Sequence, residues 1–283
     1  MRQILIGDVG STSADWALIH PDGKIEIYET QGFNPTAHNS LQLQAMTTEL
    51  ANEIGTLLPQ AELYYYGAGV GSLLDVDAMN QPFRQLFSIS ETHYASDLLG
   101  AAQALCGDSA GIVCILGTGS NACIYDGQKI SYQSPTLGYL LGDEGSGSDI
   151  GRRLIQAFFY ENMPEDLSKD FSRNIPRDRF LFLRDLYEAD RPNQRLAEVA
   201  KFAIEHKEHP FIQDLVGKSI QVFINQHLKK RANLRSVYFV GSIAHFFSEE
   251  ISHLLNKEGL ILAAVLRKPI AQLAEYHIRK QGK

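Results

Sequence analysis

The sequence has no apolar run of membrane-spanning length and little that resembles a secretory leader. Near the start, only the three residues Ile4-Leu5-Ile6 are consecutively apolar, which is shorter than the apolar core of a leader. Low-complexity linkers are missing as well. We therefore expect a cytoplasmic globular protein without a membrane partner.

Cysteine is scarce, and histidine follows no metal-binding pattern. The three cysteines, Cys106, Cys114 and Cys123, form no C-x-x-C pair and lie in apolar segments, which argues against disulfides and structural zinc. The nine histidines show no H-E-x-x-H spacing. We predict reduced core cysteines and no zinc site.

Positive charge is also in short supply. With 26 Lys and Arg against 33 Asp and Glu, the net charge of −7 gives no attraction for a polyphosphate backbone, so a nucleic-acid partner is not expected. The 283 residues, 44% of them hydrophobic, are enough for one large domain or two ordinary ones.

One pattern of strands and turns occurs twice. In each copy an apolar strand, a Gly/Ser/Thr turn, a second strand, an Asp-Gly turn and a third strand follow one another. The copies occupy residues 3–30, with turns at 10–13 and 22–23, and residues 111–133, with turns at 117–120 and 126–127. Such repetition predicts two structurally similar halves.

The segments after each meander also match. The first is followed by helix 38–57, strand 62–66, helix 75–87, strand 88–92 and helix 97–105. The second is followed by a longer helical region, strand 236–240, helix 246–255, apolar segment 260–266 and a last helix from 269. We predict an α/β fold of two lobes, residues 1–107 and 108–283, each a mixed five-stranded sheet flanked by helices. A cleft is expected between them, with a helical insertion at about 150–231, and the last helix, about 269–280, packing back on the first lobe.

The two Gly/Ser/Thr turns are candidate phosphate-binding loops. Backbone N–H groups and hydroxyls in such a tight turn can converge on phosphate oxygens. The residues concerned are Gly10, Ser11, Thr12, Gly117, Thr118, Gly119 and Ser120. Asp8, just before the first turn, is placed to hold Mg²⁺ through water. For a single turn an ordinary hairpin explains these residues as well, but the repetition favours function.

Two motifs resemble a known family. Gly117-Thr118-Gly119-Ser120-Asn121 and the segment 137–146, LGYLLGDEGS, are similar to motifs of the BadF/BadG/BcrA/BcrD-type ATPases, whose sugar-phosphorylating branch includes N-acetylglucosamine kinase. With the first turn and Gly241-Ser242, the resemblance covers most of the chain except the helical insertion. It implies actin-like (ribonuclease H-like) lobes, ATP and Mg²⁺ as cofactors, and a homodimer.

The resemblance also assigns roles to individual residues. The family carries its catalytic Asp where this sequence has Asp97, at the start of a helix rich in small residues. Helix capping by Ser96 or Asp97 is the alternative. Sugar-binding positions match Asn34, Asn121, Gly138 and Asp143, and adenine-binding positions match Gly241 and Ser242. Asn34 can instead be read as a turn before Pro35, and Asp143 as an ordinary loop residue.

Two positions depart from the family's pattern, and the first weakens the assignment of the substrate. Where the family has Gly-Gly-Trp, this chain has Pro135-Thr136-Leu137, so an aromatic platform for the sugar is missing. After Pro269, Ile270-Ala271 replaces the family's Gly-Ala.

The function predicted is phosphorylation of an amino-sugar hydroxyl by ATP, with N-acetylglucosamine as the first substrate. One alternative is an ATPase that activates a redox partner, similar to activators of 2-hydroxyacyl-CoA dehydratases, although the cysteine contexts for its iron–sulfur cluster are missing. The other is a nucleotide- or sugar-binding protein without turnover.

Overall fold

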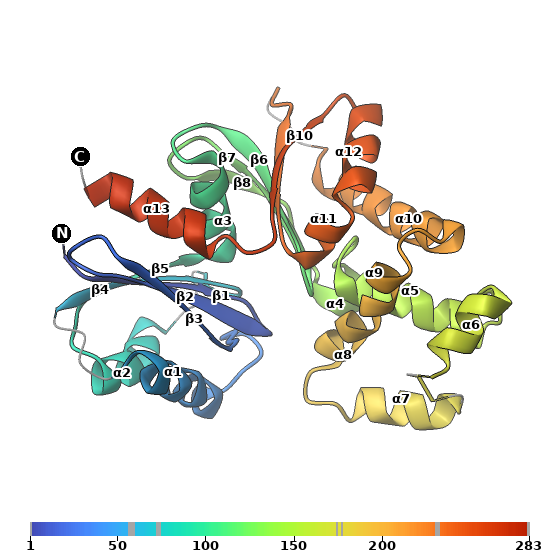
Figure 1. The fold of residues 1–283 in the computed structure, drawn as a ribbon, viewed down its shortest axis with the longest axis horizontal. Coiled ribbons are helices and arrows are strands. Elements are labelled where there is room, and N and C mark those ends of the chain that lie inside the picture. Colours follow the sequence, from blue (N-terminus) through green and yellow to red (C-terminus); the bar gives the residue numbers. More distant parts are fainter. Residues whose placement is uncertain are drawn as a thin grey trace. The chain divides into compact units, whose positions relative to one another are not determined.

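The computed structural model describes residues 2–55, 60–71, 75–173, 175–176, 178–229 and 233–281. They form two compact units (Figure 1). Unit 1 contains residues 1–110, 125–130 and 268–283, and unit 2 contains residues 111–124 and 131–267. The predicted helix end at Leu57 and the predicted end of the helical region at Arg231 lie outside the described residues.

Unit 1 is built on a five-stranded mixed sheet in the order β3-β2-β1-β4-β5. Its strands are β1 (Ile4–Val9), β2 (Ser13–Ile19), β3 (Ile25–Gln31), β4 (Ala61–Gly67) and β5 (Ile89–Ser96). The first three form the predicted antiparallel meander, and β4 and β5 run parallel to β1. Strand β5 is longer than predicted and ends at Ser96, so Asp97 lies directly at the carboxyl end of the sheet.

Helices cover both faces of this sheet because its central strands are apolar on both sides. On one face α1 (Ser40–Ile54) and α2 (Val76–Leu86) pack against a core around Trp16. On the other, α13 (Ile270–Gln281) packs on α3 (Asp97–Cys106), β1 and β2 (Figure 1). The ring of His277 on α13 lies 2.9 Å from the Tyr66 hydroxyl, which donates to Gln103 of α3.

Unit 2 repeats the same sheet topology, which confirms the predicted duplication. Read from the other edge, the order β8-β7-β6-β9-β10 matches the order β3-β2-β1-β4-β5 of unit 1 position by position. Its strands are β6 (Gly111–Leu116), β7 (Ser120–Tyr125), β8 (Ile130–Gln133), β9 (Ser236–Val240) and β10 (Ile261–Leu266). Cys114 and Cys123 are buried in β6 and β7 and Cys106 is buried in α3, so all three cysteines are core residues as predicted.

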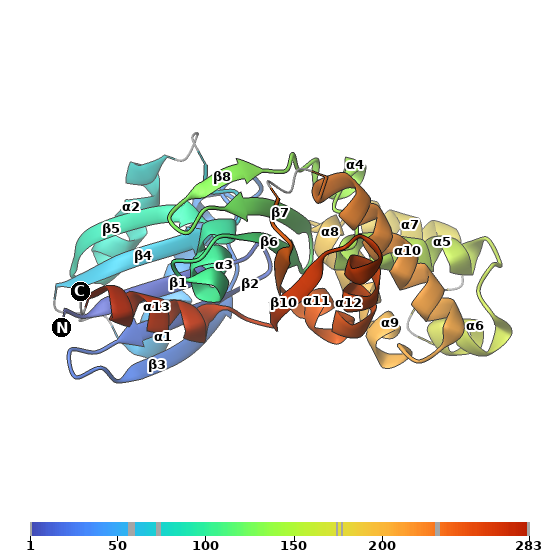
Figure 2. The ribbon, with the colours of Figure 1, turned by 90° about the horizontal axis from the view of Figure 1, so that it is seen from above.

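The long helical region of unit 2 is a series of separate helices, two of which begin at a proline. After the single turn α4 (Gly138–Leu141), Pro192 and Pro210 each occupy the first helical turn, where a missing N–H costs nothing. The helices are α5 (Gly147–Phe159), α6 (Glu165–Phe171), α7 (Arg179–Tyr187), α8 (Pro192–Val199), α9 (Lys201–Glu205) and α10 (Pro210–His227). Helix α10 runs beside α12 (Ser248–Lys257), as Figure 2 shows.

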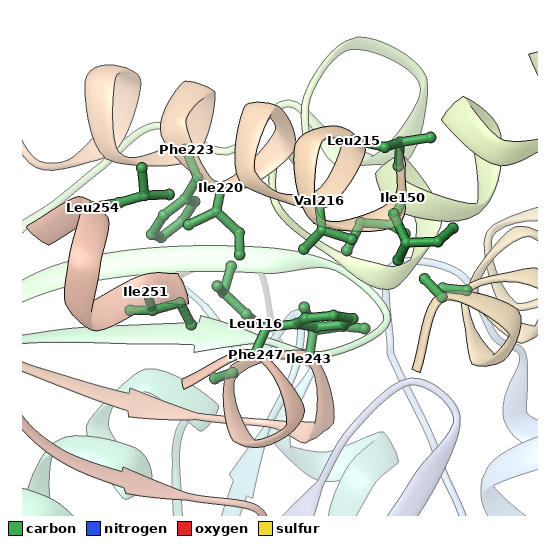
Figure 3. Packing of buried hydrophobic residues seen from close by; sticks show 14 of the residues in the cluster. Leu116, Ile150, Leu215, Val216, Ile220, Phe223, Ile243, Phe247, Ile251 and Leu254 are labelled. Atoms are coloured by element: carbon green, nitrogen blue, oxygen red, sulfur yellow. The ribbon is translucent and has the colours of Figure 1, made fainter. Parts of the chain in front are cut away.

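The core of unit 2 forms around α10. Leu116, at the end of β6, lies among Ile220 and Phe223 of α10 and Ile243 of α11 (Ser242–Phe246) (Figure 3). The carboxyl end of the central strand is therefore packed directly against the helical region. None of the helices in the described ranges combines the length and apolar character that crossing a membrane requires.

Candidate functional site

The first glycine loop, Gly10 to Thr12, joins β1 to β2 and is braced by the chain that leaves β3. The N–H groups of Gly32 and Phe33 donate to the carbonyls of Thr12 and Gly10, each at 3.0 Å. A side chain at Gly32 would place its Cβ 2.2 Å from the Gly10 carbonyl oxygen, so only glycine fits. The N–H of Gly10 donates to the Ser13 carbonyl and therefore closes the turn.

Asn34 is held against this loop. Its Nδ2 donates to the Ser11 hydroxyl at 3.0 Å, and its Oδ1 accepts from the backbone N–H and the hydroxyl of Thr36. Gly69 lies so close to Asn34 that a Cβ at position 69 would be 2.1 Å from this oxygen. The turn at Asn34, predicted as the alternative to a binding role, is therefore present. The second hydrogen of Nδ2 is still available as a donor to a ligand hydroxyl.

Two carboxyl groups lie at the carboxyl end of the unit 1 sheet. Asp8 on β1 is opposite Asp15 on β2 and next to Tyr66 on β4. Asp97 follows β5, and parallel strands bring these ends to one edge. Enclosure by protein raises the pKa of Asp8 to about 8, and the negative charges of Asp97 and Asp15 add to that effect. A nearby cation would favour the ionised form of a carboxyl group in this position.

Asp97 is positioned by the start of α3. Ser96 is the N-cap, with its hydroxyl accepting the Leu99 N–H, and one oxygen of Asp97 accepts the Leu98 N–H at 2.8 Å. Burial raises the pKa of the Asp97 carboxyl, and the backbone N–H groups oppose this shift. The capping alternative is therefore present in the structure, and it leaves the second carboxylate oxygen for chemistry.

Lys268 is a member of this region that the sequence analysis missed. Its Nζ lies 2.7 Å from Asp15 Oδ1 and 2.6 Å from Glu29 Oε1, and its charge lowers the pKa of Asp8 against the effect of burial. Lys268 is 253 positions from Asp15, so no local pattern connects them. The only sequence signal was its place directly before Pro269, at the start of the last helix.

The second glycine loop, Gly117 to Gly119, is braced by the start of α5. The N–H groups of Gly147 and Ser148 donate to the carbonyls of Gly117 and Thr118 at 2.8 and 3.1 Å. Within the loop, Gly117 donates to the Gly119 carbonyl at 3.0 Å. We expected these turns to aim their N–H groups at a ligand, but those of Gly10 and Gly117 close the turns instead.

Asp143 lies against the second loop. Its Oδ1 accepts the Ser120 N–H at 3.3 Å, and a Cβ at Gly119 would come within 2.9 Å of its Oδ2. Asp143 has a left-handed backbone with φ of 56°, and burial raises the pKa of its carboxyl. The hydroxyl of Ser120 is buried and has no hydrogen-bond partner among the described residues. A phosphate oxygen would satisfy it.

Two further predicted sugar-binding residues, Asn121 and Gly138, precede Asp143 in the sequence. Asn121 uses its Oδ1 to accept the Ala122 N–H at 2.9 Å and lies 3.4 Å from Gln133 Nε2. Gly138 begins α4 with φ of 67°, and the space where its Cβ would point is open. The beginning of α4 therefore allows close approach by a ligand.

The predicted adenine-binding residues lie at the junction of β9 and α11. Gly241 has φ of 121°, and a Cβ there would meet the Leu116 carbonyl oxygen at 2.3 Å and the Gly117 nitrogen at 3.0 Å. Ser242 is the first residue of α11. Gly241 is thus packed against the beginning of the second glycine loop, and the two predicted groups of unit 2 are neighbours.

A cavity of about 240 Å³ opens beside the other end of α11. It lies between the region before α10 and the start of α12, and none of the predicted site residues lines it. Its lining residues are Lys207, Glu208, Gln213, Val216, His245, Phe246, Phe247, Ser248, Glu249 and Glu250. Another hollow, lined only by α2 and Asp75, contains no predicted residue either.

The residues fit a magnesium ion that arrives with a nucleotide. Within the described ranges, no group of three or more His, Cys, Asp or Glu is arranged to hold a metal ion. Mg²⁺ in phosphate sites commonly uses one or two carboxylates together with water and phosphate oxygens. Asp8 is a carboxyl group of this kind: its pKa is raised by burial and by the negative charges of Asp97 and Asp15, so a bound cation would favour its ionised form.

Comparison with known proteins places the chain in a family. No protein-family model and no curated protein matches it. A crystal structure from Porphyromonas gingivalis, of a protein provisionally named N-acetylglucosamine kinase, is 35% identical over 98% of this chain and 99% of that one, with a TM-score of 0.87. The chain belongs to the family of that protein.

Other members of the fold are more distant. A provisionally named N-acetylglucosamine kinase from Chromobacterium violaceum is 18% identical over 98% of this chain and 99% of that one, with a TM-score of 0.72. A glucokinase of the ROK family from Streptomyces griseus, solved with glucose and AMPPNP, is 13% identical over 99% of this chain and 100% of that one, with a TM-score of 0.53. These two likenesses show the fold, the actin-like architecture predicted for both lobes.

Proposed function

We propose that the protein is an ATP-dependent kinase that phosphorylates a hydroxyl of an amino sugar, with N-acetylglucosamine as the principal candidate. The observation that carries this proposal is the juxtaposition, in unit 1, of a glycine loop with the two carboxyl groups of Asp8 and Asp97. The provisional name of the Porphyromonas gingivalis relative supports the choice of substrate.

In the proposed reaction Asp97 is the general base. The sugar hydroxyl oxygen forms a bond to the γ-phosphorus, the bond between that phosphorus and ADP breaks, and the hydroxyl proton passes to the Asp97 carboxylate. The products are a sugar phosphate and ADP. A pKa raised by burial makes Asp97 a better proton acceptor than an exposed Asp.

The remaining phosphate and metal contacts are assigned to residues already described. Asp8 would hold Mg²⁺ through water, and the ion would neutralise charge on the β and γ phosphates. The glycine loops would bind phosphate oxygens, with the unpaired Ser120 hydroxyl as one donor. Each loop is already fixed by backbone hydrogen bonds, so little ordering would be needed on binding.

We assign the adenine to α11 and the cavity beside it. Gly241 and Ser242 start this helix, and His245 and Phe246 near its end line the cavity. At 1.5 Å per residue, these two ends are only about 6 Å apart along the helix. A base in the cavity would therefore leave its phosphates within reach of the second glycine loop.

Substrate choice is assigned to two asparagines and to the segment between β8 and α5. Asn34, Asn121, Gly138 and Asp143 are proposed to bind the sugar hydroxyls. Leu137, where the family has Trp, is 64% exposed and offers an apolar contact without an aromatic face. An N-acyl group on the sugar suits such a surface, which ranks N-acetylated sugars before glucosamine and glucose.

The decisive experiment is an ADP-release assay with purified protein, ATP and Mg²⁺. N-acetylglucosamine, N-acetylmuramic acid, glucosamine and glucose are compared, each against the rate without sugar. We expect the strongest stimulation with N-acetylglucosamine. If no sugar raises ADP formation, the kinase proposal fails, and tight nucleotide binding without turnover would support a binding protein instead.

The redox-activator alternative is less well supported. Cys106, Cys114 and Cys123 are all buried, and burial raises the pKa of the Cys106 thiol to about 12, away from the thiolate that iron binds. Stoichiometric iron and sulfide in the purified protein would reverse this ranking.

A further inference from the structure

One face of α10 contacts the segment 142–149, which contains Asp143. Ser219, Phe223 and His227 are spaced by four residues and therefore lie in one row along the helix. Phe223 is buried on this helix beside Leu116 (Figure 3). Each of the three side chains meets a different part of the segment.

His227 binds Glu144, the neighbour of Asp143. Its Nε2 is 3.1 Å from Glu144 Oε2, and its Nδ1 is 2.8 Å from the hydroxyl of Ser134. The His227 side chain is 8% exposed and that of Glu144 23%, so the pair is largely shielded from water. With the proton on Nε2, the ring donates to Glu144 and accepts from Ser134, which fixes its orientation.

Phe223 and Ser219 hold the rest of the segment. A Cβ at Gly145 would come within 3.0 Å of the Phe223 Cβ, so this glycine allows the chain to lie directly on α10. Ser219 donates to Asp149 at 2.6 Å, and Arg153 donates to the same carboxylate at 2.9 Å. Although burial opposes it, these donors keep the pKa of Asp149 below its usual value.

Asp143 itself has only weak local support. Its left-handed backbone is unfavourable for a residue with a Cβ, and its hydrogen bond to the Ser120 N–H is long at 3.3 Å. The anchored neighbours on its carboxyl side, Glu144 and Gly145, therefore restrict where its carboxylate can point.

We propose that His227 and Glu144 are positioning residues that hold the Asp143 carboxylate against the second glycine loop. In this view α10 fixes the substrate-binding segment from outside it, without touching the substrate. A buried polar pair seldom stabilises a fold better than an apolar pair of the same size, so its value lies in orientation. The part of the inference that concerns sugar binding rests on the proposed function.

The main test compares His227→Leu with His227→Gln. Leu removes the donor to Glu144, whereas Gln keeps an N–H that can reach it. We expect His227→Leu to raise the sugar KM about tenfold, the effect of losing one charge-assisted hydrogen bond, with kcat falling less. His227→Gln should recover most of the affinity. Combined with Glu144→Gln, His227→Leu should add little further loss, because both changes break one interaction.

His206→Leu is the matched control. His206 makes a similar contact, 2.9 Å from Asp170, elsewhere in unit 2. Its loss should change stability without changing the sugar KM. If His227→Leu and His227→Gln raise KM equally, or if His206→Leu raises it as much as His227→Leu, then the effect is general destabilisation and the proposal is wrong.

A measurement without substrate separates this inference from the kinase proposal. Hydrogen exchange of the Ser120 amide reports its bond to Asp143 in the free protein. His227→Leu should speed this exchange about tenfold while His206→Leu leaves it unchanged. Unchanged exchange in His227→Leu would reject the positioning role. Faster exchange in a protein that no sugar stimulates would support that role and reject the kinase.

Discussion

The two sheets follow one topology, yet carboxyl groups collect at the strand ends of unit 1 and not at the matching places in unit 2. Asp8, Asp15 and Asp97 lie near the first glycine loop. The equivalent positions, counted from the second loop and from the end of the fifth strand, carry Ile115, Ala122 and Arg267. The carboxyl groups to which we assign acid–base and metal chemistry therefore occur in only one copy of the repeated backbone.

The loops themselves are braced in the same way. In both units two consecutive N–H groups donate to loop carbonyls: Gly32 and Phe33 in unit 1, Gly147 and Ser148 in unit 2. The first pair follows β3 directly, whereas the second begins a helix, at Gly147, with 13 residues between it and the end of β8 at Gln133. The second loop thus depends on distant supports, such as the bond between Ser219 and Asp149.

The largest expected effect tests whether the chemistry belongs to unit 1. Asp97→Asn removes the proposed base but keeps an oxygen that can accept the Leu98 N–H. Turnover should fall by about 10²–10⁴-fold while nucleotide affinity is retained. Steady-state ADP release and equilibrium nucleotide binding measure the two quantities.

Ser96→Ala is the control, because it removes the helix cap and leaves the carboxylate in place. It should cost about 1 kcal/mol of stability with turnover close to that of the wild type. Near-normal turnover in Asp97→Asn would contradict the assignment, and an equal loss in Ser96→Ala would show that capping alone explains it.

The next prediction contrasts two loop glycines. Gly32→Ala should destabilise unit 1 by about 3 kcal/mol, because its Cβ would overlap the Gly10 carbonyl. Trp16, the only tryptophan, is buried in the unit 1 core, so its fluorescence during urea unfolding reports this change.

Gly117→Ala is the counterpart in unit 2, where the Cβ position is open to a distance of 4 Å. Its stability should change by less than about 0.5 kcal/mol, as for other substitutions that touch nothing. If phosphate approaches this loop, nucleotide affinity should nevertheless fall. Affinity equal to that of the wild type would remove Gly117 from the site.

The last prediction concerns Ser120, where the effects on stability and on binding are expected to have opposite signs. Because its buried hydroxyl lacks a partner, Ser120→Ala should stabilise the free protein by up to about 1 kcal/mol and weaken nucleotide binding by a similar amount. Thermal unfolding without nucleotide measures the gain in stability, and thermal unfolding with nucleotide measures the loss of binding. Ser131→Ala, which loses a bond to the Ile124 carbonyl, should destabilise both states equally. Stabilisation that persists with nucleotide would mean the hydroxyl meets no ligand.

The order of helices and strands could be predicted from the sequence because local patterns of apolar and turn residues determine it. Apolar alternation and Asp-Gly turns predicted both meanders, and their repetition predicted two sheets of one topology. The boundaries were less accurate: β5 runs to Ser96, the expected helix 246–255 is α12, shifted by two residues, and the short helix α11 before it was not predicted. Where local propensity does not fix the end of a helix or strand, tertiary packing determines where it ends.

The sequence by itself determined which residue types stand at the ends of which strands, and hence the glycine loops and the Asp8 and Asp97 carboxyl groups beside them. Tertiary structure alone decided how those residues are held. The contacts of Lys268 with Asp15 and of His227 with Glu144 join residues 253 and 83 positions apart, and no periodicity of strand or helix relates residues at such separations. Only the packed fold brings them within hydrogen-bonding distance.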